Sequence, residues 1–361
     1  MIYETPQISG GVEAKLETLK DLRLRMSQRL NREMPWDQPL RRFVKGDAYA
    51  SSTRIEGYRV EDSRRQALAS DQAESTPRND NEEALACYAQ AMDHVATLAN
   101  DPEFRWDKRV LLDLHFEACR FQKDKRPGLI REGSIRVTAP EGGTAYTAPP
   151  ALEVSELLGE LVTSLEESTG SIDPAVEAAM AHLNLVSIHP FEDGNGRISR
   201  IIQSLVLARD GQLAPEFGSI EPYLAKNTSA YYAALMKAQK GTYSPERDAS
   251  GWVEFCMDAH IQQARERMDL IEAASTRWAR LESFVEKRGW DDRLVIALEQ
   301  ALGGGTDRAS YSGEADISNA TASNDLRRLL DAGLIDQAGK GRSTSYEPSP
   351  QLRHVVEDQD S

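Results

Sequence analysis

The sequence has few cysteines, a shortage of positive charge and no long run of apolar residues. Its 361 residues include three cysteines, Cys87, Cys119 and Cys256, which are too widely spaced for a metal-binding motif. We interpret them as core thiols of a reducing compartment. The 58 acidic and 43 basic residues give a net charge of −15. This balance disfavours non-specific binding to nucleic acid or to an anionic membrane, although a local basic patch remains compatible with it.

Signals for export and membrane insertion are also lacking. Residues 1–11 do not combine a positive start with an apolar stretch, and no apolar run reaches the length of a membrane span. We therefore expect a soluble, cytoplasmic protein without membrane contact. The chain is long enough for two or three domains, each with its own core.

What the sequence has instead is a polar, glycine-rich stretch from His189 to Arg200, which reads HPFEDGNGRISR. Apolar residues at mostly helical spacing over 174–188 predict a buried helix that ends near Pro190. Apolar residues after the stretch predict a second helix that begins around Asn195 or Gly196. Because the residue before a proline is pushed out of the αR region, we expect His189 to be extended at the exit of the first helix.

This stretch has the parts of a polyphosphate site. The Gly-Asn-Gly step at 194–196 brings backbone N–H groups to a helix N-terminus, where the dipole favours an anion. Arg197 and Arg200 lie on one face of that helix, and guanidinium groups suit phosphate oxygens. Asp193 suits a Mg²⁺ ion that bridges phosphates. His189 titrates near neutrality and suits proton removal from a hydroxyl.

Each of these features alone is more often structural. A histidine before a proline usually packs, and an Asp or an Arg pair near a helix start is more often a cap or a surface ion pair. Their occurrence together between His189 and Arg200 favours the functional interpretation.

The stretch matches every defining position of the signature HPFx(D/E)GNGRxxR, and it therefore resembles the Fic (filamentation induced by cAMP) family. This resemblance implies a helical domain that transfers AMP from ATP to a protein hydroxyl and releases pyrophosphate. By position, it implies that His189 is the general base and Asp193 the Mg²⁺ ligand. It implies that Gly194, Asn195 and Gly196 form a phosphate nest. It also implies that Arg197 and Arg200 hold the β- and γ-phosphates.

A second motif lies upstream. Asp47 is expected to cap a short helix, at about residues 47–57, that Gly57 closes. Glu56 then sits at the negative helix end, which costs a few tenths to about 1 kcal/mol, so it is either simply solvated or has a partner elsewhere. The residues from Ser52 to Gly57 match the family's inhibitory motif (S/T)xxxE(G/N). The resemblance implies that Glu56 pairs with Arg200 and blocks productive placement of the γ-phosphate.

Residues 130–147 have a sequence pattern typical of strands rather than helices. Segments 133–137 and 144–146 alternate like two short strands around the turn at 141–143. An isolated hairpin leaves an unpaired edge, which is either a tolerated loop or a strand-addition site. In the family the corresponding hairpin is a flap that holds the target segment by main-chain pairing. The resemblance places Val137 near the nucleotide and Tyr231 and Tyr232 beside the base and ribose, although an adjacent tyrosine pair often only packs.

The predicted fold is mainly α: a Fic-type helical bundle with the flap, followed by a C-terminal winged helix-turn-helix domain. The boundaries are 1–110 for an N-terminal helical region with a connector at 33–42, 111–288 for the catalytic core, 289–350 for the winged helix and 351–361 for an acidic tail expected to be disordered. His94 and His115 are expected to be packed or surface side chains without functional partners.

The winged-helix segment carries four basic side chains that suit DNA phosphates: Arg327, Arg328, Lys340 and Arg342. The segment also carries about ten carboxylates, and many winged helices contact proteins. DNA binding is therefore the less favoured interpretation. Such an appendage resembles that of long bacterial Fic proteins.

The leading hypothesis is an autoinhibited, Mg²⁺-dependent protein adenylyltransferase that uses ATP, modifies a Ser, Thr or Tyr hydroxyl and labels itself. Removal of AMP, with Glu56 orienting a water and His189 protonating the leaving oxygen, would use the same residues. A third hypothesis is a DNA-binding regulator whose Fic domain only senses nucleotide. The target, the activating signal and the oligomeric state, including a homodimer, remain open.

Overall fold

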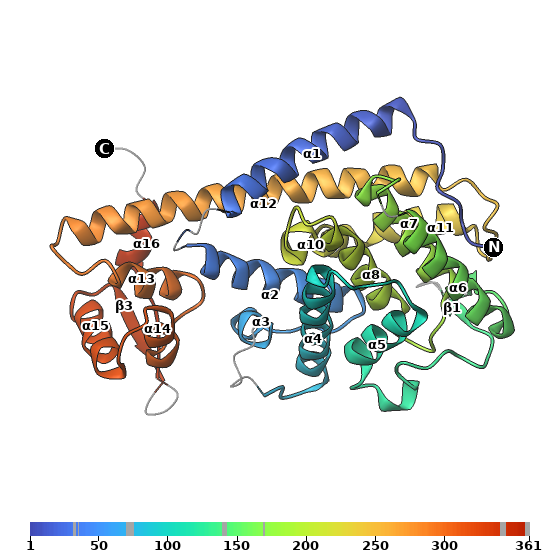
Figure 1. The fold of residues 1–361 in the computed structure, drawn as a ribbon. Coiled ribbons are helices and arrows are strands. Elements are labelled where there is room, and N and C mark those ends of the chain that lie inside the picture. Colours follow the sequence, from blue (N-terminus) through green and yellow to red (C-terminus); the bar gives the residue numbers. More distant parts are fainter. Residues whose placement is uncertain are drawn as a thin grey trace. The chain divides into compact units, whose positions relative to one another are not determined.

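The computed structural model describes residues 1–31, 34, 36–69, 76–138, 143–168, 170–339 and 344–357. The chain divides into two compact units (Figure 1). The first comprises residues 1–28 and 44–267, and the second comprises residues 29–43 and 268–361. Helices dominate both units, which confirms the predicted mainly α class.

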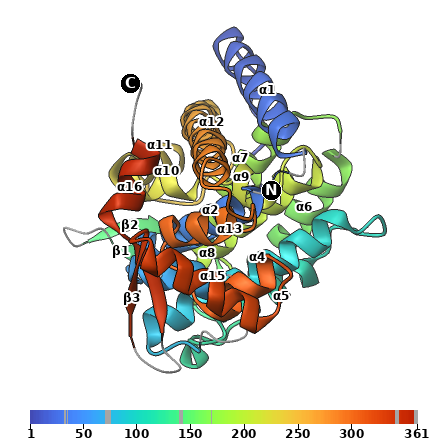
Figure 2. The same ribbon diagram turned by 90° about the vertical axis from the view of Figure 1, so that its left-hand side faces the viewer.

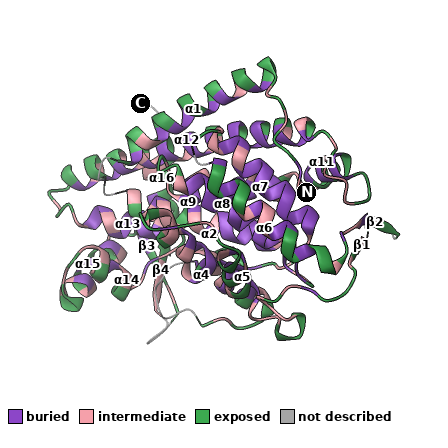
Figure 3. Cartoon of the chain, turned by 45° about the vertical axis from the view of Figure 1, so that its right-hand side comes forward, coloured by how far each residue is buried: buried purple, intermediate pink, exposed green. Residues whose placement is uncertain are grey.

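Helices α7 (Pro174–Ile188) and α8 (Asn195–Arg209) follow each other along the chain, pack closely and form the centre of the first unit. Nearly all of their side chains are buried (Figure 3). Around them pack α4 (Asp80–Asn100), α5 (Lys108–Cys119) and α6 (Ala151–Ser168). Helix α7 begins where predicted, because Pro174 occupies its first turn and the Asp173 carboxylate accepts from the Ala175 N–H.

The rest of the first unit is also helical apart from one hairpin. Strand β1 (Arg136–Thr138) pairs antiparallel with β2 (Thr144–Thr147), and Val137 lies opposite Tyr146. Residues 139–142, with part of the predicted turn, lie outside the described residues. The other helices are α1 (Gly10–Leu30), α3 (Asp62–Leu68), η1 (Lys123–Lys125), α9 (Pro215–Gly218), α10 (Glu221–Lys226) and α11 (Thr228–Gln239). Helices α2 (Asp37–Ile55) and α12 (Ser250–Glu286) contribute residues to both units, as does the end of α1.

Helix α2 corrects the prediction of a connector followed by a short helix capped by Asp47. The helix already runs from Asp37, and Asp47 lies in its interior, where its carboxylate contacts Arg267 at 3.4 Å. The physical reason is a buried apolar stripe at helical spacing, Leu40, Val44 and Ala48, which makes one helix of the whole segment. Residues 33 and 35 of the predicted connector are outside the described residues.

The second unit contains α13 (Leu294–Leu302), α14 (Arg308–Glu314), α15 (Asn319–Asp331), β3 (Ile335–Ala338), β4 (Ser345–Pro348) and α16 (Pro350–Glu357). Strands β3 and β4 pair antiparallel, and α15 packs beside β3 (Figure 2). This order of elements is the one expected of a winged helix, an assignment that stays a prediction, as does DNA binding. Lys340 and Arg342 lie outside the described residues.

Two further expectations concern the tail and the cysteines. The predicted disorder of the tail is wrong for residues 351–357, because Leu352 is fully buried and holds α16 against α13 and β4. Residues 358–361 are outside the described part. All three cysteines are buried and free, as expected of core thiols. Within the described residues, none of the helices is long and apolar enough to cross a membrane.

Candidate active site

His189 ends α7 in a left-handed conformation, with φ 52° and ψ 58°, which corrects the predicted extended backbone. This conformation also avoids the αR region before Pro190, and it keeps the His189 N–H bonded to the Leu185 carbonyl at 3.0 Å. The ring Nδ1 lies 3.1 Å from the Val186 carbonyl. Since a carbonyl only accepts, Nδ1 carries the proton and Nε2 keeps the lone pair that a general base needs.

The turn after His189 is held by its own side chains. The Asn195 amide accepts from the Phe191 N–H at 3.0 Å and donates to the Phe191 carbonyl at 2.9 Å, which closes the loop onto the start of α8. Gly194 has φ 79°, and a Cβ there would lie 2.4 Å from the Cys119 sulfur. Glycine is therefore required both by conformation and by space, and α8 begins at Asn195 as predicted.

The two motif arginines are both buried, with 1% and 2% of Arg197 and Arg200 exposed. Arg197 Nε and Nη1 and Arg200 Nη1 are buried and have no hydrogen-bond partner among the described residues. Buried guanidinium N–H groups left unpaired are costly. At the N-terminus of α8, these donors describe a site for an anion with several oxygens.

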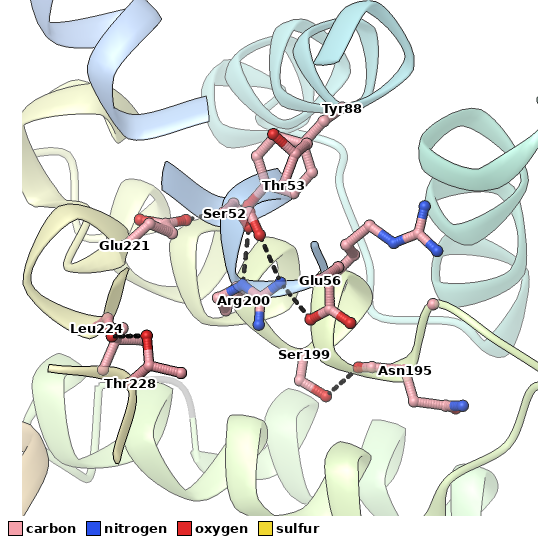
Figure 4. A network of polar contacts seen from close by, with 12 residues as sticks. Ser52, Thr53, Glu56, Tyr88, Asn195, Ser199, Arg200, Glu221, Leu224 and Thr228 are labelled. Atoms are coloured by element: carbon pink, nitrogen blue, oxygen red, sulfur yellow. Dashed lines mark hydrogen bonds and ion pairs between the residues drawn. The ribbon is translucent and has the colours of Figure 1, made fainter. Parts of the chain in front are cut away.

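Arg200 is held by the upstream motif (Figure 4). Its Nη2 donates to Glu56 Oε1 at 2.8 Å, and its Nε donates to the Ser52 hydroxyl at 2.7 Å. Burial opposes the charge of Arg200, but the neighbouring Glu56 carboxylate overrides it and raises the pKa of the guanidinium above its ordinary value. A Cβ on Gly196 would lie 2.5 Å from Glu56 Oε1, so this carboxylate rests directly against the glycine nest.

Gly57 follows with φ 94°, the left-handed closure that was predicted. Figure 4 also places Tyr88 and Glu221 around Arg200. The Glu221 carboxylate is buried and accepts from the Tyr88 hydroxyl at 3.1 Å. Burial raises the pKa of Glu221, while the nearby Arg200 lowers it.

Asp193 is the carboxylate at the metal-ligand position of the signature, and its side chain is 40% exposed. Its Oδ1 accepts from the Gly194 N–H at 2.6 Å, and its Oδ2 accepts from the Gln122 amide at 2.6 Å. The described residues contain no cluster of three or more His, Cys, Asp or Glu side chains that would hold a metal alone. One exposed carboxylate beside a phosphate site still fits Mg²⁺, which prefers one or two carboxylates together with phosphate oxygens.

His115 is a packed side chain, as expected, and it packs against the motif itself. Its ring stacks on Phe191 at 3.5 Å, Nδ1 accepts from the Gly128 N–H at 2.9 Å, and Nε2 lies 2.9 Å from the Asp193 carbonyl. Burial lowers the pKa of His115 to about 4, so the ring is neutral and donates through Nε2. It thereby fixes the backbone of Asp193. His94 also has a partner, since it pairs with Glu117 at 3.1 Å.

Arg131 ties the flap to the histidine turn. It is 3% exposed, and its guanidinium donates to the His189 carbonyl at 2.8 Å, the Gly133 carbonyl at 2.7 Å and the Pro149 carbonyl at 2.6 Å. These acceptors lie at the end of α7 and at the two ends of the flap. The sequence offered no signal for this role, because all three acceptors are main-chain carbonyls, and those of His189 and Pro149 are distant along the chain.

The three side chains outside the motif that are predicted to contact the nucleotide differ in how far they are exposed. Val137 is partly exposed on β1. Tyr232 is 41% exposed, whereas Tyr231 is buried and its hydroxyl bonds His182 Nε2 at 3.0 Å. The role of all three side chains toward a base or ribose stays a prediction.

Residues 105–207 match the Fic/DOC family. This part of the chain is therefore a Fic domain. Over 117 residues it is 38% identical to the protein adenylyltransferase fic-1 of Caenorhabditis elegans, which covers 32% of this chain and 22% of that protein. A probable protein adenylyltransferase of Aquifex aeolicus is 30% identical over 112 residues, covering 31% of this chain and 35% of that protein.

Solved Fic structures share the fold. A Fic family protein from Desulfovibrio desulfuricans G20 superposes with a TM-score of 0.61 at 20% identity, covering 96% of this chain and 99% of that one. Fic-1 from C. elegans superposes with a TM-score of 0.53 at 20% identity, covering 73% of each chain. The chain spans only 22–35% of the length of the curated relatives named above.

Proposed function

We propose that this Fic protein is an autoinhibited protein adenylyltransferase, which transfers AMP from ATP to a protein hydroxyl. The observation that carries the proposal is the group of unpartnered guanidinium nitrogens of Arg197 and Arg200 beside the glycine nest. A polyphosphate supplies oxygens for these donors. His189 lies just before the glycine turn, and its Nε2 keeps a lone pair that can take a proton. The adenylyltransferase names of the relatives support the same reaction.

In the proposed mechanism, His189 Nε2 takes the proton of a Ser, Thr or Tyr hydroxyl. The hydroxyl oxygen then bonds to the α-phosphorus, and the bond to the β-phosphate oxygen breaks, so that pyrophosphate leaves. Arg197, Arg200 and the N–H groups of Asn195 and Gly196 hold the phosphates and balance the charge that develops on them. Asp193 would hold Mg²⁺, which supplies further charge neutralisation when bound.

The target segment is proposed to add to the flap as a strand. The outer edge of β2 is already occupied, because the Thr147 N–H donates to the Gly241 carbonyl and Thr147 accepts from the Tyr243 N–H. The outer edge of β1 has no such partner among the described residues. Main-chain pairing there would position a hydroxyl without reading much sequence, and a segment of a second copy would suffice for self-labelling.

Inhibition is proposed to act through Glu56. Its carboxylate occupies the Arg200 donor and lies against Gly196, where a γ-phosphate would add its own negative charge. Phosphate and Glu56 therefore compete for one guanidinium. The alternative reaction is the removal of AMP, which would use the same two residues: Glu56 would orient a water, and His189 would protonate the leaving oxygen.

The test is self-labelling with radiolabelled ATP and Mg²⁺, read by gel. Hydrogen bonds to charged groups contribute about 1.5–3 kcal/mol, so Glu56→Gly should raise labelling by about 10- to 100-fold. Glu56→Gly/His189→Ala should lose it, and Glu61→Gly, a change at a nearby exposed glutamate, should match the parent. Equal labelling in the parent and Glu56→Gly would refute the inhibitory role. Absence of labelling despite ATP binding would favour AMP removal or a nucleotide-sensing regulator.

A further inference from the structure

Gln122 lies between two charged residues of the motif. It follows α5, and its side-chain amide contacts both the proposed metal ligand and the first arginine. Its Nε2 donates to Asp193 Oδ2 at 2.6 Å, and its Oε1 accepts from Arg197 Nη2 at 2.6 Å. Asp193 and Arg197 themselves approach only to 3.6 Å, which is longer than a hydrogen bond. The amide thus hydrogen-bonds both charged groups, whereas the two form only a loose ion pair with each other.

We propose that Gln122 is a positioning residue of the nucleotide site, a neutral spacer that keeps the loose Asp193–Arg197 ion pair from closing into a direct hydrogen-bonded contact. The two lie four residues apart at the start of α8, a spacing at which opposite charges meet on a helix. A direct pair would use a carboxylate oxygen needed for Mg²⁺ and guanidinium N–H groups needed for phosphate. This inference rests on the proposed function and deepens it.

The surroundings hold the amide in one orientation. Its second N–H donates to the Tyr58 hydroxyl at 3.0 Å. Reversal of the amide would turn its N–H groups toward the Arg197 cation and its oxygen toward the Asp193 carboxylate, so the two charges select the observed orientation. The Arg197 guanidinium also lies 5.6 Å from the ring of Tyr58 and 5.4 Å from that of Phe121. Gln122 leaves Arg197 Nε and Nη1 without partners, so these donors stay available.

The test replaces Gln122 with leucine, which has a similar size and no polar atoms. The background is Glu56→Gly/His189→Ala, so that ATP binds without turnover. Titration calorimetry measures the ATP dissociation constant with and without Mg²⁺, and their ratio reports the Mg²⁺-dependent gain in affinity. Loss of a side chain that orients a metal ligand costs about 10- to 100-fold in metal affinity, and we expect the gain to fall by that factor. Lys123→Ala, a change at the exposed neighbour, should leave the ratio unchanged.

A double substitution separates the spacer role from a structural one. In Asp193→Asn there is no carboxylate for Arg197 to pair with, so adding Gln122→Leu should not weaken metal-free ATP binding further. An unchanged Mg²⁺-dependent gain in Gln122→Leu, or additive losses in the double variant, would overturn the inference. If leucine lowers the unfolding temperature, Gln122→Ala provides the same comparison.

The outcomes also separate this inference from the proposed function. Mg²⁺-ATP binding that depends on Gln122, without any labelling by Glu56→Gly, would support the spacer and refute the transfer reaction. Labelling by Glu56→Gly with a Gln122→Leu variant equal to its parent would refute the spacer alone. Failure of every variant to bind ATP would refute both.

Discussion

At the scale of single residues, the environment of His189 determines the pH at which it can act as a base. Burial lowers the pKa of its ring, the Val186 carbonyl opposes this change, and the Arg131 cation lowers the pKa further. A general base works as the neutral ring, so the rate is lost as the pH falls through this pKa. The proposed transferase should therefore stay active below the ordinary histidine value of 6.5.

Arg131→Gln in the Glu56→Gly background tests this account. Removing the cation raises the pKa of His189, so the acid limb of the kcat/KM profile should move to higher pH. Arg131→Lys keeps the charge but cannot reach all three carbonyls, so the rate should fall at every pH while the limb stays in place. A limb that does not move in Arg131→Gln would contradict the electrostatic role.

At the scale of elements, the flap is anchored to the catalytic helix through β2. The buried Tyr146 hydroxyl donates to the Ser187 carbonyl of α7 at 2.6 Å. Tyr146→Phe leaves this carbonyl unpaired, which costs about 1–3 kcal/mol. The flap should then hold a target segment less firmly, while the phosphate-binding residues on α8 are untouched.

We expect self-labelling at saturating ATP to fall by about fivefold or more in Tyr146→Phe, on the scale of 1 kcal/mol or above. The ATP dissociation constant from calorimetry should not change. Tyr243→Phe, which removes a bond to the Met1 carbonyl instead, is the control and should label normally. An equal loss of ATP affinity in Tyr146→Phe would argue against a role in the flap.

At the scale of the whole molecule, every residue placed in the site belongs to the first unit. The second unit has its own buried residues, among them Leu326 of α15. Leu326→Ala should therefore destabilise the second unit by about 2–5 kcal/mol without changing ATP affinity. Scanning calorimetry and ATP titration provide the two measurements.

The matched change in the first unit is Leu183→Ala in α7, which should lower both stability and ATP affinity. ATP affinity that falls equally in both variants would contradict the independence of the site.

The sequence by itself determined the chemistry that is encoded locally. Residues 189–200 carry the histidine, carboxylate, glycines and arginines in one string, so their spacing alone predicted a helix, a turn and a helix N-terminus. The bond between Glu56 and Arg200 was also expected, but only through the resemblance of residues 52–57 to an inhibitory motif. Periodicity located α7 and α8 because both helices have apolar faces and recognisable ends.

Only the tertiary structure decided which distant residues support this string. Gln122, Arg131 and His115 contact the motif through side-chain and main-chain atoms of other elements, and no periodicity records such contacts. The left-handed backbone of His189 likewise follows from its bond to Leu185 and from the contact with Arg131, which act together only in the folded chain. Local spacing specifies which groups are present, whereas packing specifies which of their hydrogen bonds are already used, and therefore which remain for a nucleotide.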